Sequence, residues 1–363
     1  MRERPMSEHG GNSVEIAQQL GIAPEALLDF SANINPLGLS ARVKSLITTH
    51  LELIERYPDV EYRHLHQALA SANHCDVEQV IAGNGATELI YGLVRALSPR
   101  SAMLLVPGFA EYRRALAQQG CRVIEYRLEE SQGFQPDQQL LEAVRQQRPD
   151  CLFIATPNNP TGLMPDAQLL NELAELCETS QIALIVDEAF IDFLPQGSSL
   201  AARLVHSNYL YLLRSLTKFF AIPGLRLGYL LSGNRATIRH LKANREPWSI
   251  NGLAALVGQH LLTDDDYINL SHQYIARQRE YLWHALKQFT SLVVWQPTAN
   301  YLFFKCTHQH INLKSALLAQ RILIRHCENY PGLDSHFYRV AVRREDENRQ
   351  LIQALSQILT PDS

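Results

Sequence analysis

The sequence predicts an α/β protein: a mostly parallel sheet of seven strands with helices on both faces, and beside it a smaller α+β domain. Three observations favour this class. With 363 residues, the chain can bury a large core and divide into one large and one small domain. Between about residues 76 and 233, apolar runs alternate with segments of helical periodicity. After residue 264 the apolar runs are shorter and follow one long helical segment.

Seven apolar runs account for the predicted large sheet. Most are continuous in Val, Ile and Leu, as expected of strands that are buried on both faces of a parallel sheet. The segments between them repeat apolar residues at helical spacing, notably at residues 88–97, 110–119 and 166–179. The expected strands are residues 80–82, 102–106, 121–126, 151–155, 182–186, 209–213 and 227–231.

The C-terminal third predicts the smaller domain. Residues 264–289 begin with polar residues and continue at helical spacing, which indicates a long helix. The N-terminal segment up to about residue 35 contains no long helix and is expected to pack against this unit. The predicted large domain is residues 40–245, and the small domain combines residues 1–39 with 246–363. Its other expected elements are strands at 291–295, 301–306, 321–325 and 338–343 and helices at 312–320 and 345–359.

Composition argues against several classes of partner. The formal net charge of −4 and the absence of a Lys/Arg block speak against nucleic-acid binding. The apolar runs are far shorter than the ~20 residues of a membrane span, and the first nine residues are charged, unlike a signal peptide. The six cysteines contain no closely spaced metal or redox pair, and Cys151 and Cys306 lie in apolar runs. We therefore expect a cytoplasmic protein with buried thiols, no metal, and no membrane or nucleic-acid partner.

Three polar residues, Lys218, Asp187 and Asn159, each come just after an expected strand. Because ligands bind beyond the carboxyl ends of parallel strands, one pocket can collect all three. A lysine, an acid and an amide in this arrangement predict a pyridoxal phosphate (PLP) site. The apolar neighbours of Lys218 favour a lowered amine pKa, so that the lysine can hold the cofactor as a Schiff base.

Asp187 is expected to face the pyridine nitrogen of the cofactor. Two opposite charges ~4 Å apart attract by about 4 kcal/mol at an effective dielectric constant of ~20, which favours a protonated, electron-accepting ring. Asn159 is expected to hydrogen-bond the ring hydroxyl oxygen. The structural alternatives are a salt bridge or helix cap for Asp187, and a turn residue in Pro-Asn-Asn-Pro-Thr-Gly for Asn159.

A phosphate-binding turn is predicted at Gly85, Ala86 and Thr87, which follow a strand and open a helix. Small residues there allow backbone N–H groups and the helix N-terminus to face an anion. Phe109 follows another strand and is expected either to stack on the pyridine ring or to pack in the core. Three side chains close to the lysine in the sequence are expected to complete the phosphate site: Ser215, Thr217 and Arg226.

Together these motifs resemble the fold-type I PLP-dependent transferases, and within them the branch that contains the histidinol-phosphate aminotransferases. In that branch the tyrosine of an Arg-Tyr-Pro-Asp motif reaches the cofactor phosphate of the neighbouring subunit. The resemblance therefore implies that Tyr57 does so here, in a homodimer with shared active sites. It extends over nearly the whole chain and is carried by residues 33–38, 55–59, 83–88, 157–162, 187–190 and 215–228.

Finer features are more similar to a decarboxylase group of this family, which acts on L-threonine O-3-phosphate in cobalamin biosynthesis. They are residues 9–12, 30–38, 107–112, 187–193, 321–325 and 329–334. Phe190 stands where the aminotransferases usually carry a tyrosine that bonds the ring oxygen of the cofactor. The resemblance implies decarboxylation of that substrate to (R)-1-amino-2-propanol O-2-phosphate, and an aminotransferase of the histidinol-phosphate type is the alternative.

A small phosphoamino acid carries a carboxylate and a phosphate, so the implied substrate needs two anion sites. Arg339 matches the arginine that binds the α-carboxylate in this superfamily, and Arg325, at the end of the preceding expected strand, suits the phosphate. Three further candidates for the phosphate, given by resemblance, are His9, the Gly10 N–H and Asn33, and Asn159 is expected to border the substrate as well.

Overall fold

The computed structural model describes residues 10–194, 198–308 and 310–359. Its largest element is a seven-stranded sheet with the order β2-β8-β7-β6-β5-β3-β4. Only β8 runs antiparallel to its neighbours, so the predicted mostly parallel sheet is confirmed. The strands are β2 (Val80–Gly83), β3 (Ser101–Val106), β4 (Arg122–Arg127), β5 (Cys151–Ala155), β6 (Ala183–Asp187), β7 (Leu210–Ser215) and β8 (Gly228–Ser232).

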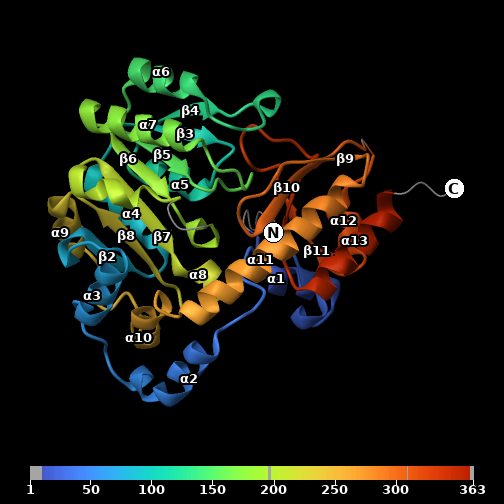
Figure 1. The fold of residues 1–363 in the computed structure, drawn as a ribbon, viewed down its shortest axis with the longest axis horizontal. Coiled ribbons are helices and arrows are strands. Elements are labelled where there is room, and N and C mark those ends of the chain that lie inside the picture. The colour runs from blue at the N-terminus through green and yellow to red at the C-terminus, as the bar shows by residue number, and fades with distance from the viewer. Residues whose placement is uncertain (1–9, 195–197, 309, 360–363) are drawn as a thin grey trace, which may run out of the picture.

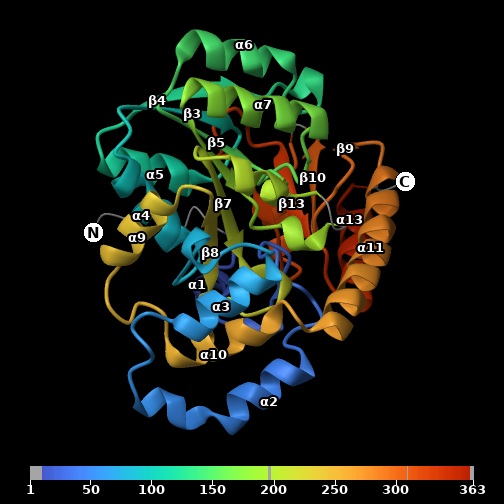
Figure 2. The same ribbon diagram turned by 60° about the vertical axis from the view of Figure 1, so that its left-hand side comes forward.

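Helices cover both faces of this sheet (Figures 1 and 2). Successive strand residues point to opposite faces and so enter two hydrophobic cores, one shared with α4, α5 and α9 and the other with α3, α6 and α7. In β5, Phe153 lies in the first core and Leu152 in the second. The helices are α3 (Arg63–Ala72), α4 (Ala86–Leu97), α5 (Ala110–Gln118), α6 (Gln138–Gln147), α7 (Ala167–Ser180), α9 (Arg235–Ala243) and α10 (Gly252–Leu261), which packs on α3.

Helices α4, α5 and α7 occupy the segments predicted as helical, whereas sequence analysis assigns neither α6 nor α9. These two helices are short and rich in polar residues, which weakens their apolar periodicity. Each nevertheless begins with a side-chain cap: Asp137 accepts a hydrogen bond from Gln139 N, and Asn234 accepts one from Thr237 N. Across the described ranges, no helix combines the length and the apolar content that crossing a bilayer requires.

The smaller unit contains an antiparallel sheet with the order β12-β13-β10-β9, against which α11 packs. The prediction of a single strand at residues 321–325 is wrong in one respect. This segment divides into β11, which pairs with β1, and β12, which pairs with β13, because consecutive residues turn to different partners. The elements are α11 (Asp265–Lys287), β9 (Leu292–Val294), β10 (Tyr301–Cys306), α12 (Leu313–Leu318), β11 (Ile322–Leu323), β12 (Arg325–His326), β13 (Phe337–Ala341) and α13 (Glu345–Leu359).

The N-terminal segment joins the C-terminal unit through β1 (Leu28–Asp29), which pairs in parallel with β11. Helix α1 (Ser13–Leu20) precedes it, and α2 (Ala41–Thr49) packs against α10 (Figure 1). We propose on this basis that residues 40–245 form the large domain and that residues 1–39 with 246–363 form the small one. Helix α10 is the exception, since it lies within residues 246–363 but packs on α3 of the large unit. The remaining elements are short: η1 (Pro24–Ala26), η2 (Leu51–Glu55), η3 (Val77–Gln79), η4 (Glu130–Gln132), η5 (Ile191–Phe193), η6 (Leu200–His206) and α8 (Leu216–Phe219).

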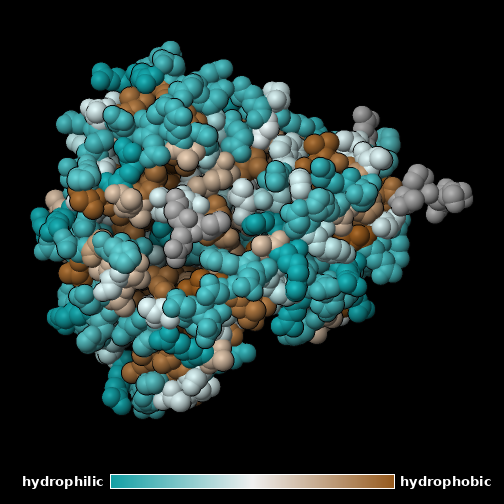
Figure 3. Space-filling view, viewed as in Figure 1, coloured by the Kyte–Doolittle hydropathy of each residue, from teal (hydrophilic) through white to brown (hydrophobic). Residues whose placement is uncertain are grey.

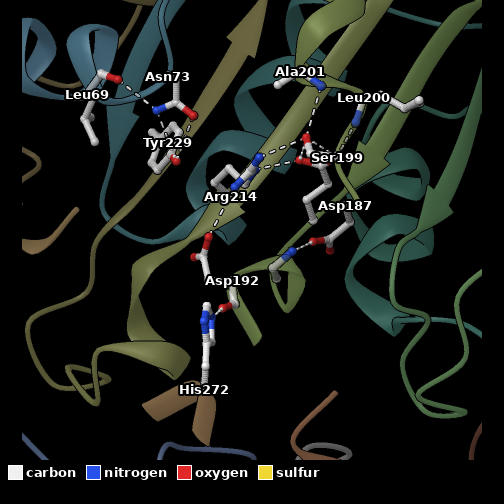
Figure 4. A network of polar contacts seen from close by, with 12 residues as sticks. Leu69, Asn73, Asp187, Asp192, Ser199, Leu200, Ala201, Arg214, Tyr229 and His272 are labelled. Carbon is white, nitrogen blue, oxygen red and sulfur yellow. Dashed lines mark hydrogen bonds and ion pairs between the residues drawn. The ribbon is translucent and has the colours of Figure 1, made fainter. Parts of the chain in front are cut away.

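A buried ionic network lies behind the ends of β6 and β7. Arg214 donates from Nε to Glu188 at 2.6 Å and from NH1 to Asp192 at 3.2 Å. Its NH2 group bonds Ser199 Oγ at 2.9 Å, and His272 of α11 contacts the Asp192 carbonyl oxygen at 2.7 Å. Figure 4 shows Arg214 between Ser199 and Asp192, with His272 beside Asp192. Burial opposes the charged guanidinium, yet the pKa of Arg214 is raised because Glu188 and Asp192 lie so close.

Arg214→Met should lower the free energy of unfolding by about 3–5 kcal/mol, because the buried carboxylates of Glu188 and Asp192 then lack their cation. Urea unfolding followed by circular dichroism measures this change. Arg235→Met is the matched control, since Arg235 is 46% exposed and pairs with two exposed carboxylates. Its loss should change stability by less than about 1 kcal/mol. Equal losses from the two substitutions would contradict the importance of the buried network.

Candidate active site

Adjacent parallel strands bring three sequence-predicted residues to one edge of the large sheet. Asp187 is the last residue of β6, Lys218 lies in α8 directly after β7, and Asn159 lies in the loop after β5. The segment around Asn35 holds α8 in place: its N–H donates to the Lys218 carbonyl oxygen at 3.0 Å, and its side chain donates to the Phe219 carbonyl oxygen at 2.9 Å. The lysine therefore sits on a short helix that Asn35 holds by two hydrogen bonds.

The Lys218 amine lies in a largely desolvated position. Its Nζ donates to Ser215 Oγ at 2.9 Å, and Ser215 in turn shares a hydrogen bond of 2.8 Å with the Thr217 hydroxyl. Loss of solvation lowers the pKa of Lys218 from 10.5 to about 8. The positive charge of Arg226 also lowers this pKa, and the negative charge of Asp187 acts to raise it. A fraction of the amine is therefore unprotonated near neutral pH and available as a nucleophile.

Lys218→Met should stabilise the cofactor-free protein at neutral pH, and the gain should disappear as the pH rises from about 8 to 10.5. The pKa of Lys218 is lower in the folded protein than in the unfolded chain. When the pH falls through this window, the unfolded chain therefore takes up the proton first. The wild-type protein thereby loses stability as the pH drops to 8, and the substituted chain does not. Urea unfolding of both chains across this range measures the difference, and a difference independent of pH would contradict the depressed pKa.

Asp187 is a buried carboxylate, 7% exposed, with a donor on each oxygen. Its Oδ1 accepts the Ala189 N–H at 2.9 Å, and its Oδ2 accepts the Tyr112 hydroxyl at 2.5 Å. Burial raises the pKa of Asp187 above its usual 3.8, although both hydrogen bonds and the charge of Lys218 act in the opposite direction. A cationic group placed beside this carboxylate would relieve the unfavourable effect of burial.

The predicted phosphate-binding turn lies beside Arg226. Helix α4 begins at Ala86 and Thr87, directly after Gly85, whose positive φ of 82° favours glycine. A Cβ atom on Gly85 would lie only 2.6 Å from Arg226 NH2, so the missing side chain allows the guanidinium to approach the helix start. Free N–H groups, a guanidinium and the nearby Ser215 hydroxyl can together bind a phosphate.

Arg339 of β13 is bound to the loop after β5. It is 5% exposed and donates from NH1 to Asn159 Oδ1 at 2.5 Å and from NH2 to the Ser31 carbonyl oxygen at 2.8 Å. Tyr330 also donates to Asn159 Oδ1, at 3.3 Å. Because the amide oxygen has two donors, the Nδ2 group of Asn159 is the donor left for a ligand. The Arg339 Nε is buried without a partner among the described residues.

Arg325 lies directly opposite Arg339 in the register of β12 and β13. Directly opposed residues share one face of a sheet, so the two guanidinium side chains start from the same face. Arg325 NH2 donates to Asn329 Oδ1 at 2.7 Å, and its guanidinium lies 5.2 Å from the ring centroid of Tyr330. The two candidate anion-binding groups are therefore neighbours in the sheet.

The N-terminal candidates for substrate binding lie near Ser31, the residue that Arg339 binds. A Cβ on Gly10 would lie 2.2 Å from the Ser31 carbonyl oxygen, so glycine allows this close approach. Asn33 is 5% exposed, and its Oδ1 has no hydrogen-bond partner in the part of the chain that the structure describes. A buried amide oxygen of this kind is a group that a donor of a ligand would satisfy. His9 lies outside the described residues.

The two aromatic candidates take different positions. Phe109 precedes α5, is partly buried, and meets Tyr112 edge-on at 5.5 Å between ring centroids, so it borders the surroundings of Asp187. Tyr57 is 80% exposed, and its ring packs at a tilt of 35° against that of Trp248, with 4.6 Å between the ring centroids.

Comparison with known proteins identifies the family. Residues 25–355 match the aminotransferase class I and II family. The chain belongs to this family. It is 48% identical to the threonine-phosphate decarboxylase of Salmonella typhimurium, covering 98% of this chain and 97% of that protein.

Two solved structures show how this member of the aminotransferase class I and II family folds. The histidinol-phosphate aminotransferase of Clostridium acetobutylicum has a TM-score of 0.85 at 31% identity, with 92% of this chain and 99% of that chain covered. The histidinol-phosphate aminotransferase of Sinorhizobium meliloti, solved in complex with pyridoxal-5'-phosphate, has a TM-score of 0.87 at 20% identity, with 99% and 98% covered. The predicted fold class, that of the fold-type I PLP-dependent transferases, is confirmed.

The donor set of this family member fits PLP. The cofactor carries a phosphate, a phenolic oxygen, an aldehyde and a ring nitrogen. The turn at Gly85 with Arg226, the free amide donor of Asn159, the Lys218 amine and the buried Asp187 carboxylate offer one suitable group for each. Within the described ranges, no group of three or more His, Cys, Asp or Glu side chains is arranged to hold a metal ion.

Sequence reasoning assigned no role to two tyrosines of this site. Tyr112 contacts Asp187, and Tyr330 contacts both Asn159 and the guanidinium of Arg325. Tyr112 stands three residues after Phe109, the helical spacing that places two residues on one face, and this spacing is the signal that could have indicated it. No comparable signal existed for the contact of Tyr330 with Asn159, because the two residues are 171 positions apart.

Proposed function

We propose that this chain catalyses the PLP-dependent decarboxylation of L-threonine O-3-phosphate to (R)-1-amino-2-propanol O-2-phosphate, in cobalamin biosynthesis. The observation that carries the proposal is the 48% identity, over nearly the whole chain, to a threonine-phosphate decarboxylase. Arg325 and Arg339, which lie opposite each other and of which the second donates to Asn159, support it, because a phosphoamino acid needs two cationic groups.

The chain's own residues bind and orient the substrate. Arg339 binds the α-carboxylate, using the Nε group that has no partner among the described residues. Arg325 binds the substrate phosphate with Asn33, the Gly10 N–H and His9. Anchoring both ends of a short substrate leaves little freedom of rotation, and that restraint selects which bond at Cα stands perpendicular to the cofactor ring.

Lys218 moves the proton that completes the reaction. PLP, when bound, supplies an electron-poor ring that accepts the electron pair of the broken Cα–carboxylate bond as carbon dioxide leaves. Asp187 would hold a proton on the ring nitrogen. Lys218, held by Ser215 and in its ammonium form, would donate a proton to the substrate Cα and then regain one from solvent. Protonation at Cα yields the amine product, and the reaction consumes one proton for each carbon dioxide released.

Phe190 is the local departure from the aminotransferase pattern. It is 7% exposed and packs edge-on against Tyr301 at 4.9 Å, with Lys218 Nζ 5.9 Å from its ring centroid. A phenylalanine cannot donate a hydrogen bond to the ring oxygen of the cofactor, so Asn159 is the side chain that binds this oxygen.

The test supplies the purified protein with PLP and two alternative sets of reactants. Release of carbon dioxide from L-threonine O-3-phosphate, without glutamate formation from histidinol phosphate and 2-oxoglutarate, is the expected result. Glutamate formation from the second set, with no carbon dioxide from the first, would replace this proposal by a histidinol-phosphate-type aminotransferase.

We also propose that the protein is a homodimer with shared active sites. Ile54 is 69% exposed and Tyr57 is 80% exposed. Trp248, against which the Tyr57 ring packs at a tilt, is 46% exposed. Figure 3 shows hydrophobic side chains on the surface where α2, α3 and α10 meet. An exposed apolar patch of this kind favours association with a second copy, and Tyr57 then reaches the cofactor phosphate of the partner subunit. All six cysteines are free thiols, which supports our placement of the enzyme in the cytoplasm.

Ile54→Asp should convert the dimer into monomers and weaken PLP binding, because a charge enters the apolar contact and Tyr57 no longer reaches its partner site. Sedimentation equilibrium measures the mass, and absorbance titration measures PLP affinity. Leu270→Asp is the control, since Leu270 is 55% exposed on α11, in a different element. A monomeric wild-type protein that binds PLP normally would contradict shared sites.

A further inference from the structure

Tyr112 is bound directly to the carboxylate that the proposed function assigns to the cofactor ring. Its hydroxyl donates to Asp187 Oδ2 at 2.5 Å, and both residues are buried, with 4% and 7% exposure. The Ala189 N–H occupies the other carboxylate oxygen. The carboxylate is therefore held at two points, and it keeps further lone pairs for a ligand.

The position of this hydroxyl is set by packing. The Tyr112 ring stacks on Phe153 of β5 with 4.9 Å between centroids and meets Phe109 edge-on at 5.5 Å. Helix α5, which carries Tyr112, packs against β3 and β4. A ring fixed on two sides cannot swing its hydroxyl away, so the hydrogen bond to Asp187 does not depend on a mobile side chain.

The charge state of Asp187 is what this hydrogen bond affects most. Burial raises the pKa of Asp187, and the Tyr112 hydroxyl acts against that rise because a hydrogen bond to a carboxylate favours its charged form. Burial and the neighbouring carboxylate raise the pKa of Tyr112 well above 10, so Tyr112 remains a donor at every working pH.

We propose that Tyr112 is a positioning residue that keeps the Asp187 carboxylate ionised and correctly oriented toward the ring nitrogen of PLP. The inference rests on the proposed function for its cofactor but not for its substrate. It predicts that the Tyr112 hydroxyl contributes to cofactor binding and to the protonation of the ring even when no substrate is present.

The test compares Tyr112→Phe with the wild-type protein by absorbance titration with PLP. Removal of the hydroxyl retains the packed ring, so the fold should persist while PLP affinity falls roughly ten- to a hundredfold, the usual range for a hydrogen bond to a charged group. The pH midpoint of the visible absorbance of bound PLP should also move upward. Without the Tyr112 hydroxyl the ring nitrogen carries less positive charge, so the ionisable groups beside the ring keep their protons up to a higher pH.

Two controls separate positioning from packing. Tyr211→Phe removes another buried tyrosine hydroxyl, which contacts Thr237 rather than Asp187, and should alter neither PLP affinity nor absorbance. In the Asp187→Asn background, Tyr112→Phe should have no further effect on the absorbance midpoint, since the carboxylate it acts on is gone. An equal effect of Tyr112→Phe in both backgrounds, or no effect in either, would overturn the inference.

The outcomes for the inference and for the proposed function differ. If PLP binds and responds to Tyr112→Phe as described while phosphothreonine is not decarboxylated, the proposed substrate fails and the role of Tyr112 stands. If the wild-type protein decarboxylates phosphothreonine and Tyr112→Phe changes neither PLP affinity nor absorbance, only the role of Tyr112 is overturned. A wild-type chain that takes up no PLP would overturn both.

Discussion

Lys218→Ala should abolish turnover of L-threonine O-3-phosphate, lowering kcat by at least about 10³-fold, and should remove the visible absorbance of lysine-bound PLP. The substitution deletes both the amine that joins the cofactor and the group that donates the proton to Cα. Loss of a desolvated amine should not harm the fold, because its burial disfavours the charged form. The measurements are carbon dioxide release and the absorption spectrum of the purified protein.

Two further substitutions identify the amine itself as the cause. Lys218→Arg keeps a positive charge but not a nucleophile, so it should lose as much activity as the alanine variant. Lys287→Ala removes an exposed lysine at the end of α11 and should leave kcat and the spectrum unchanged. Turnover that survives in Lys218→Arg would remove Lys218 from its proposed role.

Arg339→Lys should lower kcat/KM for phosphothreonine by roughly 30- to 1000-fold, or about 2–4 kcal/mol. A lysine carries the same charge but cannot bind a carboxylate and also donate to Asn159 Oδ1 and the Ser31 carbonyl oxygen. The loss therefore combines a weaker carboxylate contact with buried acceptors that lack a donor. Steady-state kinetics with phosphothreonine measure it.

Arg325→Lys provides the comparison that separates the two anion sites. If Arg325 binds the phosphate, its substitution should reduce the preference for phosphothreonine over unphosphorylated threonine, because only the first substrate uses that contact. Arg339→Lys should reduce kcat/KM for both substrates in similar proportion. If instead Arg339→Lys reduces the preference for phosphothreonine and Arg325→Lys affects both substrates equally, then Arg339 binds the phosphate and Arg325 binds the carboxylate.

The large sheet could be predicted from sequence because a strand buried on both faces has few alternatives. Runs such as residues 182–186 are too apolar for the surface and too short for a buried helix, and Asp187 marks where the run meets the site. The same reasoning placed Lys218 and Asn159 after neighbouring strands, since parallel strands end at a common edge. Their chemical roles remain proposals.

The contacts between distant segments could not be predicted. Nothing in the periodicity of residues 321–343 shows that Arg325 stands opposite Arg339, because strand register depends on how two strands meet. The hydrogen bond from Tyr112 to Asp187 likewise depends on the packing of α5 against the sheet. Apolar patterns indicate which side chains are buried, and the choice of polar partner is made only in the assembled core.

The bond from Arg339 to the Ser31 carbonyl oxygen joins residues 308 positions apart in the sequence, and β1 pairs with β11 over a similar separation. During synthesis from the N-terminus, the first contact cannot form until β13 has left the ribosome, and the second cannot form until β11 has done so. The large sheet can assemble earlier, while the carboxylate-binding arginine reaches its place last. A polypeptide that has been synthesised only as far as β13 therefore contains Lys218 but not Arg339. We expect such a polypeptide to be inactive toward the substrate while it is still bound to the ribosome.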